Sequence, residues 1–209
     1  LLAVFLNKGV RFLAVYRAVF YVPSLIGGSV AIALLWRQVF GAEGLLNYAL
    51  QTIGIHHETS WIGSPSTSLS TLVILQTWQF GSAMIIFLAG LRQIPQSYYD
   101  AASIDGANTI QRFFYVTLPM LSPIILFNTV MVMIGAFHAF NAAYIISSGS
   151  GGPADSLLFF TLYLYQQGFV NFDFGYASAL GWLLILAIAT ATAVLLISTR
   201  RWIHYGEDG

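Results

Sequence analysis

The sequence SYYDAASIDGANTIQRFFYVTLP, Ser97–Pro119, is a polar elbow that joins two apolar segments. The apolar segments, residues 69–91 and 113–154, contain no Asp, Glu, Lys or Arg. Each reaches the roughly 20 apolar residues that a helix needs to cross a bilayer. A polar, helix-prone connection between two such segments is expected at a membrane surface, so the elbow indicates a membrane-spanning chain.

The composition supports the same conclusion. The chain has 209 residues, of which 57% are hydrophobic and 8% charged, and its mean hydropathy is +0.76. A soluble domain carries about 25% charged residues. Residues 18–36 and 174–199 are two further runs without charge. We therefore predict an all-α, polytopic helical membrane protein with about five spans, forming one transmembrane domain over residues 1–209.

The first residues, LLAVFLNKG, lack a Met and do not follow the order of a signal peptide. They resemble the end of an apolar segment. We expect that a further spanning helix precedes Leu1.

The basic residues predict the orientation of the chain. Positive charge marks the cytoplasmic side of a membrane protein. Seven of the eight basic residues lie in alternate connections: Lys8, Arg11, Arg17, Arg92, Arg112, Arg200 and Arg201. We expect residues 7–17, residues 92–112 and the C-terminus to face the cytoplasm, and the connections 40–68 and 147–173 to face outward.

Several classes of function are disfavoured. The net charge is zero and no basic cluster exists, so nucleic acid is not an expected partner. The only lysine, Lys8, is not part of a phosphate-binding P-loop. Adjacent histidines such as His56 and His57, beside Glu58, point apart on a helix or strand. His138 has no second metal ligand at helical spacing, so we expect no metal site.

The elbow contains the signals for a helix–turn–helix. Pro95 ends the preceding span, and Ser97 with Asp100 three residues later predicts a capping box at a helix start. Asp105 and Gly106 offer a helix end, because Gly readily adopts the left-handed conformation.

A second helix then follows. Asn108 or Thr109 is expected to cap it, and it would run to Leu118-Pro119, where the next span begins. Ala101 and Ala102 would leave a shallow surface that another protein can approach closely. The alternative is that these alanines only favour the helix.

The outer connections differ from each other. Residues 40–68 are predicted to form a mixed loop. Residues 147–173 begin with the flexible SSGSGGP, and ADSLLFFTLYLYQQGF, residues 154–169, predicts a short amphipathic helix.

The order Asp100-Ala101-Ala102, Asp105-Gly106-Ala107, Leu118-Pro119 resembles the EAA loop of ABC-importer permeases, here residues 92–119. Asp100 stands where that family has Glu. The run IFLAGLRQIPQSYYDAASIDGA resembles the carbohydrate-uptake type. GGP, LYLYQQGF and FGYASALGWLL resemble the outer loop and last span of the maltose-permease-like first permease subunit. The resemblance extends over essentially the whole chain and implies the MetI-like permease fold.

This resemblance implies that residues 97–108 form a coupling helix that docks on a separate ATP-binding subunit. When a dimer of such subunits closes on ATP, the helix would move as a rigid lever and switch the pathway between its open forms. The residues expected to couple the two proteins are Ser97, Asp100, Ala101, Ala102, Asp105, Gly106 and Ala107. ATP and Mg²⁺ would be bound by the partner ATPase, and no cofactor is expected in this chain.

The resemblance also implies the other partners and the location. The partners would be a second homologous permease subunit, an extracytoplasmic solute-binding protein, membrane lipid and a sugar substrate. The chain would be a multi-pass protein of a bacterial or archaeal cytoplasmic (inner) membrane.

Polar side chains within the spans indicate where a substrate would pass, because such groups are costly in a membrane. The resemblance places substrate contacts midway along the second and third spans, on Gln76, Gln79, Phe80, His138 and Asn141. Amide and imidazole groups beside aromatic rings suit a hydroxyl-rich sugar, although the residue types do not imply maltose itself. The alternative is that these groups bond across helices and hold the bundle together.

Other functions remain open at this stage. The cargo could instead be glycerol 3-phosphate, which the absence of buried Arg or Lys disfavours. A stand-alone secondary carrier would leave the elbow unexplained. An intramembrane enzyme would need Asp100, Asp105 or His138 to meet in one site, although the predicted topology separates them.

Overall fold

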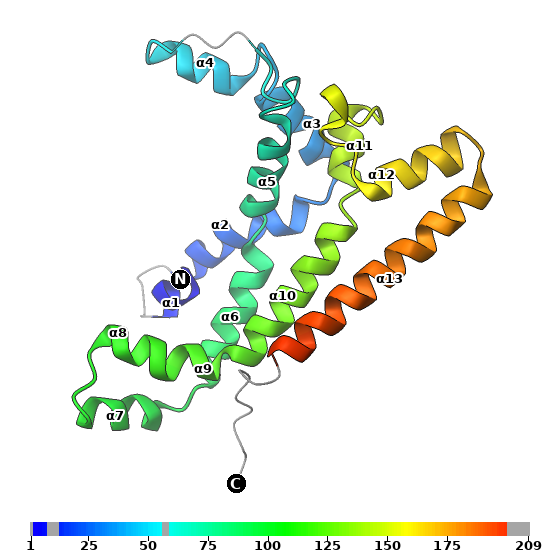
Figure 1. Cartoon of the computed structure of the whole chain (residues 1–209). Coiled ribbons are helices and arrows are strands. Elements are labelled where there is room, and N and C mark those ends of the chain that lie inside the picture. Colours follow the sequence, from blue (N-terminus) through cyan, green and yellow to red (C-terminus); the bar gives the residue numbers. More distant parts are fainter. Residues whose placement is uncertain (1, 8–12, 56–58, 200–209) are drawn as a thin grey trace. The chain divides into compact units, whose positions relative to one another are not determined.

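The computed structural model describes residues 2–7, 13–55 and 59–199, and within these ranges all regular secondary structure is helical (Figure 1). This confirms the all-α prediction. The α-helices are α1 (Leu2–Asn7), α2 (Leu13–Ile26), α3 (Val30–Val39), α4 (Leu45–Thr52), α5 (Ser68–Trp78), α6 (Gly81–Gln93), α7 (Gln96–Ile104), α8 (Thr109–Arg112), α9 (Leu118–Met120), α10 (Ser122–Phe137), α11 (Asn141–Ser147), α12 (Phe160–Tyr165) and α13 (Phe174–Thr199). Residues Phe113–Thr117 (η1) and Gln166–Val170 (η3) are π-helical, and Pro153–Asp155 (η2) is a 3₁₀ turn.

Three helical stretches of the described chain are long and apolar enough to cross a membrane: Ser68–Gln93, Ser122–Ser147 and Phe174–Thr199. The pair α2 and α3, bent by 101° at its break, makes a fourth if it is one span. The polytopic prediction is thereby confirmed. The count is lower than the expected five, because α1 has only six described residues.

Contacts between Cα atoms divide the chain into two compact units. Unit 1 contains residues 1–21, 81–134 and 189–209, and unit 2 contains residues 22–80 and 135–188. The single transmembrane domain expected from the sequence stays a prediction.

In unit 1, α1 packs on α6 around a small apolar core. Leu6 is fully buried there, with Met84 and Leu88 from α6. The first residue of α6 must be small: a Cβ at Gly81 would lie 2.2 Å from the carbonyl oxygen of Phe20. The backbone of α2 therefore approaches α6 directly at this glycine.

In unit 2, α3, α5 and α11 surround a core that includes Leu75, Leu157 and Leu162. Hydrogen bonds reinforce the packing. The Trp36 indole N–H donates to the carbonyl of Thr71 at 2.9 Å, and the hydroxyls of Ser68 and Ser156 are 2.8 Å apart. These contacts fix the loop after α11 against α5.

The outer connection 40–68 is more ordered than a mixed loop, because it contains α4 and a buried asparagine. Asn47, 2% exposed, donates to the carbonyls of Ala42 (2.8 Å) and Thr59 (3.2 Å), and its side-chain oxygen accepts from the Trp61 indole (2.6 Å). For His56, His57 and Glu58 the sequence predicted a loop without a metal site. These three residues lie outside the described part of the chain.

The outer connection 147–173 contains a shorter helix than predicted. Helix α12 begins at Phe160 rather than at Ala154. Ala154 and Asp155 have φ angles of +49° and +57°, which an α-helix cannot include, and the Leu157 N–H turns back to the carbonyl of Gly151 (2.8 Å). The prediction for residues 154–159 was wrong for this reason.

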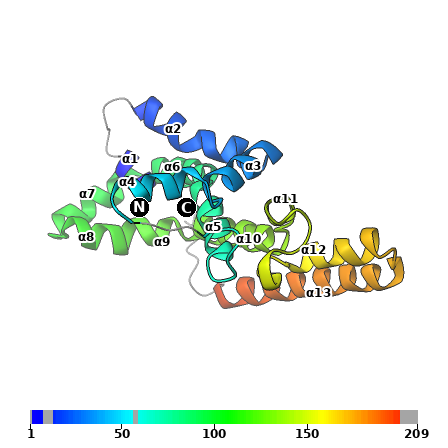
Figure 2. The ribbon, with the colours of Figure 1, turned by 90° about the horizontal axis from the view of Figure 1, so that it is seen from above.

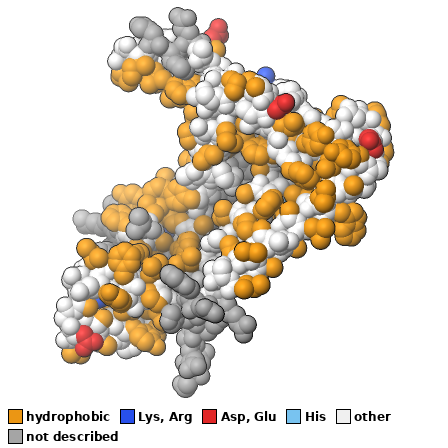
Figure 3. Space-filling view, viewed as in Figure 1, with side chains coloured by type: hydrophobic (Ala, Val, Ile, Leu, Met, Phe, Trp, Pro, Cys, Tyr) orange, Lys and Arg blue, Asp and Glu red, His pale blue; other side chains and the backbone are white. Residues whose placement is uncertain are grey.

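Much apolar surface is exposed on the chain by itself, as Figure 3 shows by the hydrophobic side chains spread over its surface. Helix α13 is apolar all round and has only Ala177 and Leu180 buried. A helix with this composition is expected to face lipid or other protein chains.

Candidate functional site

The predicted elbow forms a helical hairpin in unit 1, with α7 and α8 beside each other in both ribbon views (Figures 1 and 2). None of the residues of α7 is buried. A helix of nine residues without a buried face gains little from packing within its own chain, so a binding partner is the expected source of its remaining contacts.

Helix α7 does not start as predicted. Its N-cap is Pro95, which is extended at φ −60° and ψ 138°, and no side chain caps the first turn. Ser97 therefore lies inside the helix, and the predicted Ser97–Asp100 capping box is wrong. Instead, Asp100 accepts a hydrogen bond from the Gln96 side-chain amide at 3.1 Å.

The end of α7 follows the prediction in detail. Gly106 has φ +76°, and its N–H donates to the carbonyl of Ser103 at 3.1 Å. The N–H of Ala107 donates to the carbonyl of Ala102 at 2.9 Å. This pair of bonds is the Schellman arrangement, in which the last free carbonyls of the helix are satisfied.

Asn108 starts the second helix, as one of the two predicted caps. Its side-chain oxygen accepts from the Gln111 N–H (2.9 Å), and the Gln111 side chain accepts from the Asn108 N–H (2.8 Å). The helix continues into the π-helical η1, and Pro119, which has no N–H, follows directly after the cap residue Leu118. The Leu118 N–H bonds the carbonyl five residues back, at Phe113.

Two side-chain bonds hold the hairpin closed. The hydroxyls of Tyr99 in α7 and Thr117 in η1 are 3.0 Å apart, and the Arg112 Nε–H donates to the carbonyl of Ala107 at 3.0 Å. These two bonds link α7 and the turn that follows it to the second arm of the hairpin.

The residues predicted to couple to an ATPase gather on this hairpin. Ala102 and Ala107 are half-buried, whereas the others are exposed: Ser97, Asp100, Ala101, Asp105 and Gly106. Exposed apolar side chains flank them, with Ile104 87% exposed and Tyr115 80% exposed. Such side chains beside small alanines are typical of a surface that another protein covers.

The residues predicted to meet a substrate lie at interruptions of two spans, all within unit 2. Gln79 and Phe80 form the turn between α5 and α6, and Gln76 lies in the last turn of α5. His138 lies in the break between α10 and α11, and Asn141 begins α11. Interrupted helices at membrane depth are tolerated where they are covered by protein or line a water-filled cavity.

The polar side chains at these breaks have no partner within the described chain: Gln76, Gln79, His138 and Asn141 make no side-chain hydrogen bond there. The contrast is Asn128 in α10, which is buried and donates to the carbonyl of Ile124 at 3.0 Å. This difference disfavours the alternative that these four groups hold the helices of this chain together.

Gln79 lies against a third break, between α2 and α3. A Cβ added at Gly27 would meet the Gln79 side-chain Cδ at 2.1 Å, whereas a Cβ at Gly28 would meet nothing within 4 Å. Gly27 therefore leaves the space that the Gln79 amide occupies. The sequence pattern did not reveal this contact, because the two residues are far apart along the chain.

An aromatic cluster in unit 2 was also missed by sequence reasoning. Phe140 stacks on Tyr144 with ring centroids 5.3 Å apart, and both contact Tyr165 at 5.2 and 5.4 Å. The side-chain interaction with Tyr144 raises the pKa of Tyr165, which lies outside the spans. Phe140 precedes α11, Tyr144 lies in α11 and Tyr165 ends α12, so only the fold brings the three rings together at the break that contains His138.

Metal binding finds no support in the described part of the chain, which holds no group of three or more His, Asp or Glu side chains. His138 is exposed and apart from any carboxylate cluster. His56, His57 and Glu58 are among the undescribed residues.

Comparisons with known proteins agree with this geometry. Residues 4–205 match the sequence model of a family described as "Binding-protein-dependent transport system inner membrane component". The chain is 50% identical over 204 residues to a probable ABC transporter permease protein, YesP, of Bacillus subtilis (strain 168), covering 98% of this chain and 66% of that protein. It is 34% identical over 197 residues to the lactose transport system permease protein LacF of Rhizobium radiobacter, covering 93% of this chain and 66% of LacF. The chain thus spans just under two thirds of the length of these relatives.

A solved structure shares the fold. It is a chain of the bacterial alginate ABC transporter in complex with alginate pentasaccharide-bound periplasmic protein, with a TM-score of 0.84 and 20% identity, covering 96% of this chain and 70% of that one. This likeness confirms the permease fold predicted from the sequence. The chain belongs to the family of binding-protein-dependent transport system inner membrane components.

Proposed function

We propose that this chain is a transmembrane permease subunit of an ATP-driven, binding-protein-dependent carbohydrate importer. The observation that supports this best is the α7–α8 hairpin, which is closed by its own hydrogen bonds and yet has no buried residue in α7. A rigid hairpin with an uncovered face suits a lever that an ATPase grips. In this role the chain is a transport subunit rather than an enzyme.

The names of its relatives favour carbohydrate as the cargo. Besides LacF, the chain is 34% identical to the arabinooligosaccharides transport system permease protein AraP of Bacillus subtilis (strain 168). Amides and an imidazole at the helix breaks, near stacked aromatic rings, suit sugar hydroxyls and sugar faces. Glycerol 3-phosphate is less suited, because no Arg or Lys lies among the residues proposed to line the path.

The proposed partners follow from the same role. ATP and Mg²⁺ would be held by a dimer of ATP-binding subunits that dock on the hairpin. A second homologous permease would complete the pathway, and an extracytoplasmic solute-binding protein would deliver the sugar. The assembly would lie in a bacterial or archaeal cytoplasmic membrane, in contact with lipid.

Transport would then proceed by alternating access. ATP-driven closure of the docked subunits would push the hairpin, and the attached helices would move with it as rigid bodies. Gln76, Gln79, Phe80, His138 and Asn141 would contact the sugar, because interrupted helices place polar groups at the depth where transporters bind substrates.

Purification tests this function. When the chain is isolated from its native membrane in mild detergent, an ATPase and a second permease should co-elute with it. Vesicles reconstituted with these chains and the binding protein should accumulate sugar only with ATP. Sugar accumulation by this chain without an ATPase would instead show a secondary carrier.

A further inference from the structure

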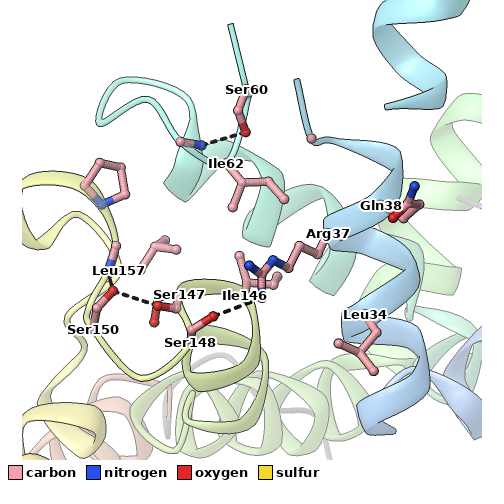
Figure 4. A pocket seen from close by; sticks show the side chains of 14 residues that line it. Leu34, Arg37, Gln38, Ser60, Ile62, Ile146, Ser147, Ser148, Ser150 and Leu157 are labelled. Atoms are coloured by element: carbon pink, nitrogen blue, oxygen red, sulfur yellow. Dashed lines mark hydrogen bonds between the residues drawn. The ribbon is translucent and has the colours of Figure 1, made fainter. Parts of the chain in front are cut away.

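A cavity of about 630 Å³ lies in unit 2, among α3, the 60–63 turn and the loop that follows α11 (Figure 4). Its volume falls within the roughly 300–1,000 Å³ of small-molecule sites. Its polar lining includes Arg37 and four serines, and none of the described residues that line it is acidic. The serines are Ser60, Ser147, Ser148 and Ser150.

Arg37 is exposed, and the hydrogen bonds within the protein leave donors at this cavity that are available to a ligand. The Arg37 guanidinium donates from Nη1 to the Ser148 hydroxyl at 2.9 Å, and it has no other partner among the described residues. A guanidinium carries further N–H groups and cannot lose its charge. The Ser60 hydroxyl accepts from the Gly63 N–H at 3.0 Å, so its own hydrogen remains available.

Hydrogen bonds hold the wall of the cavity opposite α3 in a defined conformation. Ser147 donates to the carbonyl of Ala143 (2.6 Å) and accepts from the Gly151 N–H (3.3 Å). Ser150 donates to the carbonyl of Ser147 (2.6 Å) and accepts from the Gly152 N–H (3.2 Å). Gly151 and Gly152 have φ angles of +88° and +76°, which favour glycine at both positions.

We propose that this cavity binds an acidic saccharide, with the carboxylate of a uronic acid on Arg37 and its hydroxyl oxygens on the serine side. A guanidinium pairs with a carboxylate through two parallel hydrogen bonds, and no acidic residue competes for it among the described residues that line the cavity. A single carboxylate side chain of another protein would fill only part of the volume, which favours a small molecule.

The proposal rests on the proposed function only in treating the bound saccharide as a transport substrate. Arg37 belongs to the predicted outer side of the chain, so an acidic sugar would meet this cavity before it enters the pathway. Binding to the cavity itself requires neither ATPase nor transport.

Binding of galacturonate and galactose to the purified full-length protein in nanodiscs tests the proposal, by saturation-transfer NMR and titration. Galacturonate should bind, with an affinity that falls as salt screens the charge pair. Galactose should bind about tenfold or more weakly than galacturonate, and Arg37→Gln should weaken galacturonate binding by about tenfold or more, because either change removes the charge-assisted hydrogen bonds between Arg37 and the carboxylate. Arg37→Lys should bind with intermediate affinity, and Ser66→Ala, outside the cavity, should match the unchanged protein.

Equal binding of galactose and galacturonate would overturn the proposal, as would full galacturonate binding by Arg37→Gln. Arg37-dependent binding of an acidic peptide without binding of galacturonate would overturn it in favour of a protein ligand. ATP-driven uptake of neutral sugar that survives any of these results would leave the proposed function standing, so the two failures are distinguishable.

Discussion

Substitution of Gly27 by alanine tests whether Gln79 belongs to the proposed sugar path. The added Cβ meets the end of the Gln79 side chain, which can swing away, so Gly27→Ala should fold while displacing the Gln79 amide. Loss of one hydrogen bond to substrate, worth about 0.5–1.5 kcal/mol, should weaken apparent affinity in uptake assays roughly twofold to tenfold. Gly28→Ala is the matched control, and equal kinetics for the two variants would remove Gln79 from the path.

In the hairpin, Gly106 is the glycine whose substitution tests the proposed coupling role. Its φ of +76° costs a residue with a side chain about 1–2 kcal/mol, and Gly106→Pro also removes the N–H that bonds Ser103. We expect Gly106→Pro to abolish uptake while the protein remains in the membrane at normal abundance. Gly135→Ala, at a position with open space around it, should transport normally. Wild-type uptake by Gly106→Pro would contradict the coupling role.

A bulky side chain at Ala102 is expected to have the same consequence. Ala102 is half-buried at the end of α7, and its carbonyl receives the Ala107 N–H. Ala102→Trp should reach the membrane but lose sugar-stimulated ATP hydrolysis, because the surface next to Ala101 would no longer be shallow. Ala14→Trp, on an exposed position of α2, provides the control for a bulky residue elsewhere.

At the scale of elements, the capping box of α8 should hold the hairpin in shape. Asn108→Ala removes the side-chain oxygen that accepts from the Gln111 N–H, one of the two bonds of the capping box, and should cost about 1 kcal/mol of local stability. A loss of about 1 kcal/mol raises the population of the locally open state about fivefold, so hydrogen exchange at the Gln111 amide should become about fivefold faster. Thr109→Ala, which leaves both bonds intact, should exchange as the unchanged protein does. Equal protection in both variants would show that the cap is dispensable.

The outer helix α4 depends on one buried side chain. Asn47→Ala would remove the side chain that bonds the Trp61 indole and the carbonyls of Ala42 and Thr59, at a cost of about 1–3 kcal/mol. Limited proteolysis of residues 40–68 should accelerate in this variant and not in Thr52→Ala, whose hydroxyl bonds only within its own helix. A protease pattern that Asn47→Ala leaves unchanged would contradict the role of this network.

Sequence alone predicted those elements whose signals are local. Asn108 as a cap and Gly106 as a stop depend on neighbours within five residues, and both signals were recognised. The start of α7 was wrong because Pro95 and Gln96 replace the expected cap of Ser97. The late start of α12 was missed because the residue types at positions 154 and 155, Ala and Asp, do not indicate a positive φ.

The candidate path was only partly predictable for a related reason. Polar residues within apolar runs identified Gln79 and His138, since their cost in a membrane can be judged from sequence. Their contacts could not be judged in this way. The space that Gly27 leaves for Gln79, and the rings that meet at Phe140, join residues that only the folded chain brings together.

At the scale of the whole molecule, the proposed function requires that the hairpin be covered by an ATP-hydrolysing subunit. The chain contains no cysteine, so Ala101→Cys introduces a single thiol on an exposed position of α7. Ile197→Cys, on the exposed surface of α13, provides the control for a thiol that faces lipid or solvent.

Site-specific crosslinking from these two thiols in intact cells is the most direct measurement. We predict that Ala101→Cys forms a covalent adduct with a nucleotide-hydrolysing subunit, that ATP trapping changes the yield, and that Ile197→Cys forms no such adduct. The contrary result is that Ala101→Cys reacts only with lipid or with reagents in solution, in cells that import the sugar. It would contradict the coupling of this hairpin to an ATPase.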